Sequence, residues 1–136
     1  MQLSVVDINA AFASLSGFKG RSPVSAGPAF DAAFDKLAVT ESGAVFAAKF
    51  QGTSAWERHP NGDELVQIVD GNARVTILHE GDENVFEMSA GMITIVPRGA
   101  WHRFEAPDGV EVMTLTPQPT EHWRQDGPPP AGKIEI

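Results

Sequence analysis

The feature that most constrains the fold is a run of short β-type segments from Ala44 to Thr116. The run as a whole is rich in Val, Ile, Phe and Thr, and turn-forming residues interrupt it about every eight to twelve residues, which is typical of an antiparallel sandwich or barrel. The predicted strands are Ala44 to Phe50, Ala55 to His59, Glu64 to Val69, Ala73 to Leu78, Val85 to Met88, Ile93 to Val96, Trp101 to Glu105 and Val110 to Thr116. The sequence therefore predicts an all-β fold of two facing sheets.

Turn signals between these segments predict local connections. Asn61-Gly62 suits a tight hairpin, Asp70-Gly71-Asn72 suits another, and the polar run from Glu80 to Asn84 suits a longer loop. We therefore expect neighbouring strands to be joined by short turns.

The two ends of the chain differ from this central region. Residues 1–43 are predicted to be an N-terminal edge segment packed on the barrel, with a short helix from Ile8 to Leu15 after Asp7. Residues 44–116 form the predicted barrel. Residues 117–136 form a Pro-rich tail that we expect to lie extended on the surface or across a neighbouring subunit, without a catalytic role. All three parts fit one domain of 136 residues.

Composition limits the possible partners and chemistry. Eighteen acidic and ten basic residues give a net charge of −8, which argues against nucleic acid and membrane partners. The absence of cysteine excludes disulfides and thiolate ligands, so a metal site must use nitrogen and oxygen donors. The first basic residue is Lys19 and no apolar run reaches the length of a membrane span, so we expect a cytoplasmic protein.

The first group of candidate functional residues lies around a predicted turn. Residues two apart in a strand share a face, so Glu57 and His59 are predicted to project together while Arg58 points away. The turn at Asn61-Gly62 should fold the following strand back beside the first. This would place Glu64 near His59.

The second group follows another sharp turn. Pro97 and Gly99 enforce this turn, and the next strand presents His102 and Phe104 on one face. His102 is thus a fourth candidate ligand. Four polar side chains near or beyond these segments are interpreted as surface residues: Arg98, Arg103, His79 and His122.

These two segments resemble the paired motifs of the cupin superfamily, which are small double-stranded β-helix or jelly-roll barrels. The first motif is matched by Gly52, His59, Glu64 and Gly71, with Glu57 where the family usually has its first His. The second is matched by Gly91, Pro97, Gly99 and His102, with Ala106 in place of the usual Asn. Two gapped motifs in order favour the fold more strongly than any one function.

The resemblance implies a metal site in the barrel. We expect His59, Glu64, His102 and Glu57 to bind one divalent transition-metal ion, Fe, Mn, Ni or Zn. Such a protein would be an oxygenase or isomerase acting on a small polar organic molecule, with Glu57 the alternative general base.

Two other readings remain open at this point. The exchange of His for Glu57 also fits a metal-free pocket that binds a sugar or an organic acid. A structural domain without a ligand fits the fold, although it leaves the grouping of His59, Glu64 and His102 unexplained. Small barrels of this kind expose sheet edges, and the resemblance also points to a homodimer.

Overall fold

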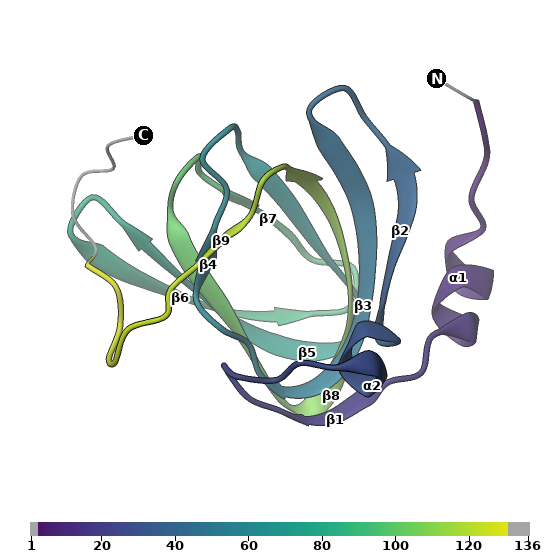
Figure 1. The fold of residues 1–136 in the computed structure, drawn as a ribbon, viewed down its shortest axis with the longest axis horizontal. Helices are drawn as coiled ribbons and strands as arrows, with labels where there is room; N and C mark the ends of the chain where they lie inside the picture. The colour runs from purple at the N-terminus through teal and green to yellow at the C-terminus, as the bar shows by residue number, and fades with distance from the viewer. Residues whose placement is uncertain (1–2, 131–136) are drawn as a thin grey trace.

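The computed structural model describes residues 3–130. Within these residues nine strands form one continuous sheet that curls into an open barrel (Figure 1). The strands are β1 (Phe18–Arg21), β2 (Phe34–Val39), β3 (Gly43–Thr53), β4 (Glu57–Arg58), β5 (Glu64–His79), β6 (Asp82–Ser89), β7 (Ile93–Val96), β8 (Trp101–Pro117) and β9 (Glu121–His122). The predicted all-β barrel is therefore confirmed.

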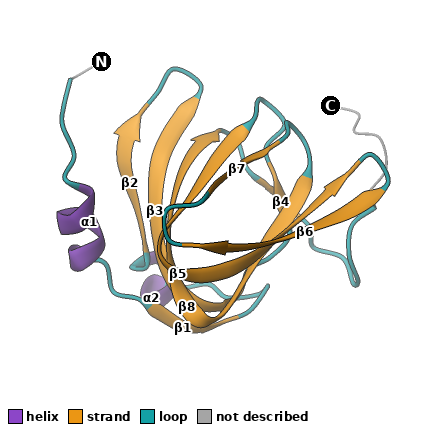
Figure 2. Ribbon diagram, turned by 180° about the vertical axis from the view of Figure 1, so that it is seen from behind, coloured by secondary structure: helices purple, strands orange, loops and turns teal. Residues whose placement is uncertain are grey.

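Two long strands organise the sheet. β8 pairs antiparallel with β3 along one edge and with β5 along the other, while β5 also pairs with β6 and β7. The main path runs β1-β3-β8-β4-β9, with β2 added beside β3. Seen from behind, β6 and β7 lie on the near side of the barrel, beside β5 (Figure 2).

The predicted hairpin at Asp70-Gly71-Asn72 is wrong. β5 runs without interruption through this point, and the register with β8 shifts there instead. Gly71 has a φ of +78°, which bends the strand without reversing it. A Cβ at Gly71 would collide with the carbonyl oxygen of Gly109, where β8 makes the corresponding bend. The turn-forming residues Asp70-Gly71-Asn72 therefore mark a bend in the wall of the barrel.

The N-terminal segment contains the expected helix and two further strands. Helix α1 (Ile8–Ser14) is capped by Asp7, whose carboxylate accepts a hydrogen bond from the amide of Ala10 at 3.1 Å. After α1, strand β1 pairs parallel with β3 and strand β2 pairs antiparallel with it, on either side of the one-turn helix α2 (Pro28–Asp31). The sequence predicted neither strand. Neither helix in residues 3–130 is long and apolar enough to cross a membrane.

The tail also joins the sheet. Its short strand β9 pairs antiparallel with β4, with Glu57 opposite His122. The side chain of Arg58 donates to that of Glu121 at 2.9 Å, and the two strands lie together at one side of the barrel (Figure 1). Residues 131–136 of the predicted tail lie outside the described residues.

The apolar core fills the closed end of the barrel. The alternation in β5 turns Val66 and Ile68 fully inward, in line with Glu64 at the start of the strand. Burial of a side chain of this size stabilises the fold by about 1.5–3 kcal/mol. The core cluster comprises Phe50, Val66, Ile68, Ala73, Val75, Ile77, Met88, Val96, Ala100, Phe104, Ala106, Val110 and Val112. This packing fixes the strands that carry the polar residues described next.

Candidate metal centre

Three of the predicted site residues come together from separate elements. His59 follows β4, Glu64 begins β5, and His102 is the second residue of β8. The chain turns at Pro60 to Gly62 as predicted, but β4 pairs with β8 and β9, and no pairing of β4 with β5 occurs among the described residues. Glu64 thus approaches His59 across the turn, outside any hairpin ladder.

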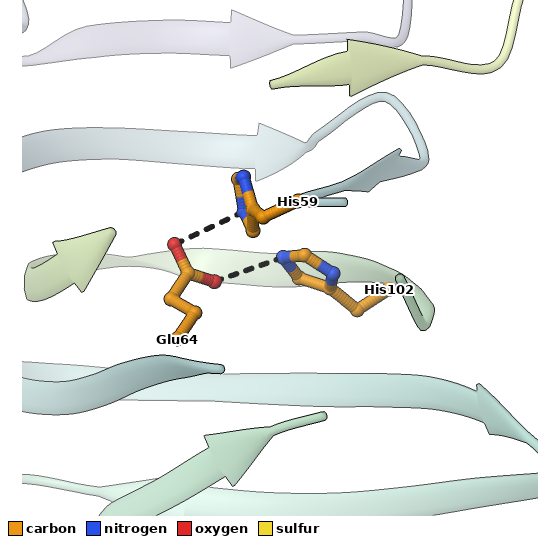
Figure 3. Close-up of side chains that lie close together, drawn as sticks. All are labelled: His59, Glu64 and His102. Carbon is orange, nitrogen blue, oxygen red and sulfur yellow. Dashed lines mark ion pairs between the residues drawn. The ribbon is translucent and has the colours of Figure 1, made fainter. Parts of the chain in front are cut away.

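The carboxylate of Glu64 lies between the two imidazoles (Figure 3). Its Oε2 is 3.2 Å from Nε2 of His59, and its Oε1 is 3.0 Å from Nε2 of His102. Each of the three residues offers one potential ligand atom, and these three atoms all lie within 4.8 Å of one another. All three side chains are buried, and His102 is fully so.

Hydrogen bonds on the outer side hold these residues in place. Thr116 donates to Oε2 of Glu64 at 2.6 Å, and Thr120 lies 3.0 Å from Nδ1 of His59. Nδ1 of His102 lies 3.1 Å from the carbonyl oxygen of Ala100, which can only accept. Nδ1 of a neutral His102 therefore carries the proton, and its Nε2 presents a lone pair to the cluster.

The inward atoms have no such partners. Nε2 of His59, Nε2 of His102 and Oε1 of Glu64 are buried, and none of them makes a hydrogen bond to any residue from 3 to 130. The imidazole–carboxylate contacts are short but lack the alignment of hydrogen bonds. Buried polar atoms without partners are costly, so three of them converging on one point require an explanation. A cation bound by these donors would supply it, and the donor set fits a divalent transition metal.

The three groups also influence one another's pKa. Burial by itself would raise the pKa of the Glu64 carboxyl, but His102 and His59 outweigh burial and hold that pKa well below its usual range. Burial would lower the pKa of His102, and the Glu64 carboxylate raises it overall. Glu64 is consequently ionised at neutral pH, as a metal ligand must be.

Glu57, the fourth predicted ligand, lies in the same cavity with a different neighbour. Its Oε2 is 3.5 Å from Nε2 of His122 on β9, and the compact donor cluster comprises only the other three residues. Burial opposes ionisation of Glu57, but His122 and His102 lower its pKa below the usual value. Glu57 is therefore a second carboxylate beside the cluster.

A cavity of about 470 Å³ opens onto the cluster. Five phenylalanines supply most of its apolar wall: Phe30, Phe34, Phe46, Phe50 and Phe104. Arg21 from β1 and Thr120 and His122 from the tail also line it. The sequence interpretation did not place Arg21, Thr120 or His122 in the pocket, because the N-terminal segment was interpreted only as an edge and the tail as surface.

Comparisons with known proteins identify the family and the fold. The sequence profile described as a cupin domain matches residues 45–116, which is more than half of the chain. The chain belongs to the cupin family. The sequence of this cupin matches no curated protein.

Solved structures show the same fold. This cupin superposes on a cupin-2 domain protein from Shewanella frigidimarina with a TM-score of 0.62 at 18% identity, covering 84% of this chain and 95% of the other. Hydroquinone 1,2-dioxygenase PnpCD, in complex with Cd²⁺ and 4-hydroxybenzonitrile, gives 0.53 at 19% identity over 62% and 63%. The oxalate decarboxylase of Bacillus subtilis, which has Mn(II) centres, gives 0.53 at 20% identity over 58% and 23%. At these identities the likeness concerns the fold.

Proposed function

We propose that this cupin binds one divalent transition-metal ion and uses it to transform a small organic molecule in the cavity, as an oxygenase or an isomerase. The observation that carries this is the convergence of three buried donor atoms without hydrogen-bond partners, from His59, Glu64 and His102. A metal ion that is held by two imidazoles and one carboxylate, and that keeps open coordination positions, is typical of non-haem Fe(II) oxygenases. The same donors suit Mn, Ni and Zn.

Several residues of the cavity have a part in this proposal. A bound metal would supply Lewis-acid or oxygen-activating chemistry. Thr116 and Thr120 orient the ligand side chains, and the phenylalanine wall excludes water from the bound molecule. Glu57 stands beside the cluster as either an additional ligand or a general base.

Metal content tests the proposal directly. Protein expressed in medium supplemented with Fe, Mn, Ni and Zn should carry about one equivalent of one of them by elemental analysis. His59→Ala and His102→Ala should each lose it, whereas His79→Ala is the control because His79 is half-exposed and outside the cluster. A wild-type protein with less than about a tenth of an equivalent would overturn the metal proposal.

One observation favours a metal-free alternative. Oε1 of Glu64 lies 3.0 Å from Nε2 of His102, and that carboxylate raises the pKa of His102, so a protonated His102 and Glu64 would form an ion pair that needs no metal ion. Under this alternative the cavity would bind a sugar or an organic acid, and the protein would catalyse no reaction. Elemental analysis separates the two, because only the alternative is compatible with metal-free protein that still binds an organic ligand.

A further inference from the structure

Arg21 enters the cavity from the end of strand β1, at a point where the two backbones come unusually close. β1 pairs with β3 so that Arg21 lies opposite Gly52. A Cβ at Gly52 would collide with the backbone oxygen and nitrogen of Arg21, and the φ of Gly52 is +122°. The glycine therefore allows the close approach that brings Arg21 to the cavity wall.

Aromatic rings from three elements surround the guanidinium. Its Cζ lies 4.4 Å from the ring centre of Phe50 on β3, 5.1 Å from that of Phe30 on α2 and 5.2 Å from that of Phe34 on β2. Cation–π contacts of this length fix the group and favour its charge. They use none of its N–H donors, so these remain available for another partner.

Arg21 has no polar partner in the part of the chain that the structure describes. Its Nε is buried without a hydrogen bond, and no carboxylate among residues 3–130 lies within ion-pair distance of the guanidinium. Burial lowers the pKa of Arg21, and Glu57 opposes this only through a longer-range attraction. A guanidinium does not lose its proton in proteins, so the cavity wall holds a positive charge that makes no direct ion pair with a carboxylate of residues 3–130.

We propose that Arg21 binds the carboxylate of a small organic acid in this cavity. The planar fork of N–H donors matches a carboxylate, and a partly buried charge of this kind is most stable when paired. The phenylalanine wall around it would cover the apolar body of the same molecule. Since Asp31, Glu57 and Glu64 also line the cavity, a singly charged anion suits the site better than a phosphate dianion.

That the acid is a substrate rests on the proposed function, whereas its binding to Arg21 does not require a metal. This separation determines the experiment. Binding is measured by isothermal titration calorimetry with three pairs of probes, each a carboxylate and its neutral amide: benzoate and benzamide, phenylacetate and phenylacetamide, isobutyrate and isobutyramide. Each titration is run on the protein as purified and again after treatment with a chelator, so that a carboxylate–metal bond cannot account for the result.

For at least one pair, chelated wild-type protein should bind the carboxylate about tenfold more tightly than the amide. Arg21→Met should abolish this preference, and Arg21→Lys should weaken it because lysine lacks the bidentate fork. Arg103→Met is the matched control: its guanidinium stacks on Trp56 at 4.7 Å and does not line the cavity. It should keep the preference.

If Arg21→Met fails to fold, the comparison of carboxylate and amide binding by the wild-type protein still tests the inference. The absence of a carboxylate preference in all three pairs would overturn the inference, and so would a preference that survives in folded Arg21→Met. Metal-free protein with an Arg21-dependent preference would support the inference while overturning the metal proposal. Protein that carries a metal but does not distinguish the carboxylate from the amide would support the metal proposal and overturn the inference about Arg21.

Discussion

The hydroxyl of Thr116 determines how Glu64 presents its carboxylate. It donates to Oε2 at 2.6 Å, which leaves Oε1 directed toward His102. Thr116 also lies 2.6 Å from the hydroxyl of Thr114, so two adjacent hydroxyls on β8 support one ligand. A residue in this position would influence a bound metal without touching it.

Thr116→Val should therefore weaken metal binding while preserving the fold. Valine has nearly the shape of threonine but leaves Oε2 without its donor, and the loss of such a supporting contact typically costs 10- to 100-fold in metal affinity. Competition with a chromophoric chelator measures this affinity. The control is Thr76→Val, another buried threonine, which lies outside the cluster. Equal affinities in the two variants would contradict the role given to Thr116.

The sequence was sufficient to predict the three clustered residues but not their surroundings. The spacing of His59, Glu64 and His102 follows from strand alternation and from the two motifs, both of which are local patterns. Arg21 and Thr120 reach the cavity through pairings with strands far away in the chain, β1 with β3 and β9 with β4. No local pattern encodes such a register, so these residues could be found only from the structure.

Among the elements, β9 has more influence on the site than its two residues suggest. It keeps Thr120 against His59, and its connection is reinforced by the Arg58–Glu121 pair and by the edge-to-face rings of Trp101 and Trp123, 5.6 Å apart. The backbone amide of Trp123 also donates to the carbonyl of Trp56 at 2.9 Å.

Truncation after Pro119 should loosen the metal site without unfolding the barrel. It removes β9 and the Thr120 contact, but leaves the core cluster intact. We expect metal affinity to fall by about tenfold and the melting temperature to fall by a few degrees. Truncation after Pro130 is the matched control, since it keeps every described contact of the tail. Wild-type affinity in the shorter protein would show that β9 does not support the site.

The strands themselves were predictable where alternation is strong, as in the run from Glu64 to Ile68. The error at Gly71 arose because glycine at positive φ serves both a tight turn and a bend within a strand. β1 and β2 were missed because each has few apolar residues in alternation. They are ordered mainly by pairing with β3, which is a tertiary interaction.

At the scale of the whole molecule, the outer edge of the barrel is unusually apolar. Strand β7 pairs only with β5 among the described residues, and it exposes 61% of Ile93 and 51% of Ile95. Leu115, on the outer surface of β8, is 40% exposed. Edge strands of this kind are sites of association.

We expect this edge to form a homodimer interface. Size-exclusion chromatography with light scattering should give twice the chain mass of 14.6 kDa. Ile93→Lys combined with Ile95→Lys should yield a folded monomer, because two desolvated charges oppose association. Val39→Lys, at an exposed position on β2, is the control and should stay dimeric. A monomeric wild-type protein would contradict the expectation.

The contact between His59 and Thr120 has a consequence for biosynthesis. The two residues are 61 positions apart, and the cluster between them also needs Glu64 and His102. A growing polypeptide therefore lacks the support of Thr120 while β9 is still inside the ribosome, although all three clustered residues have already been synthesised. If this cupin binds a metal, a chain that has not yet released its tail would hold the ion more weakly than the finished protein.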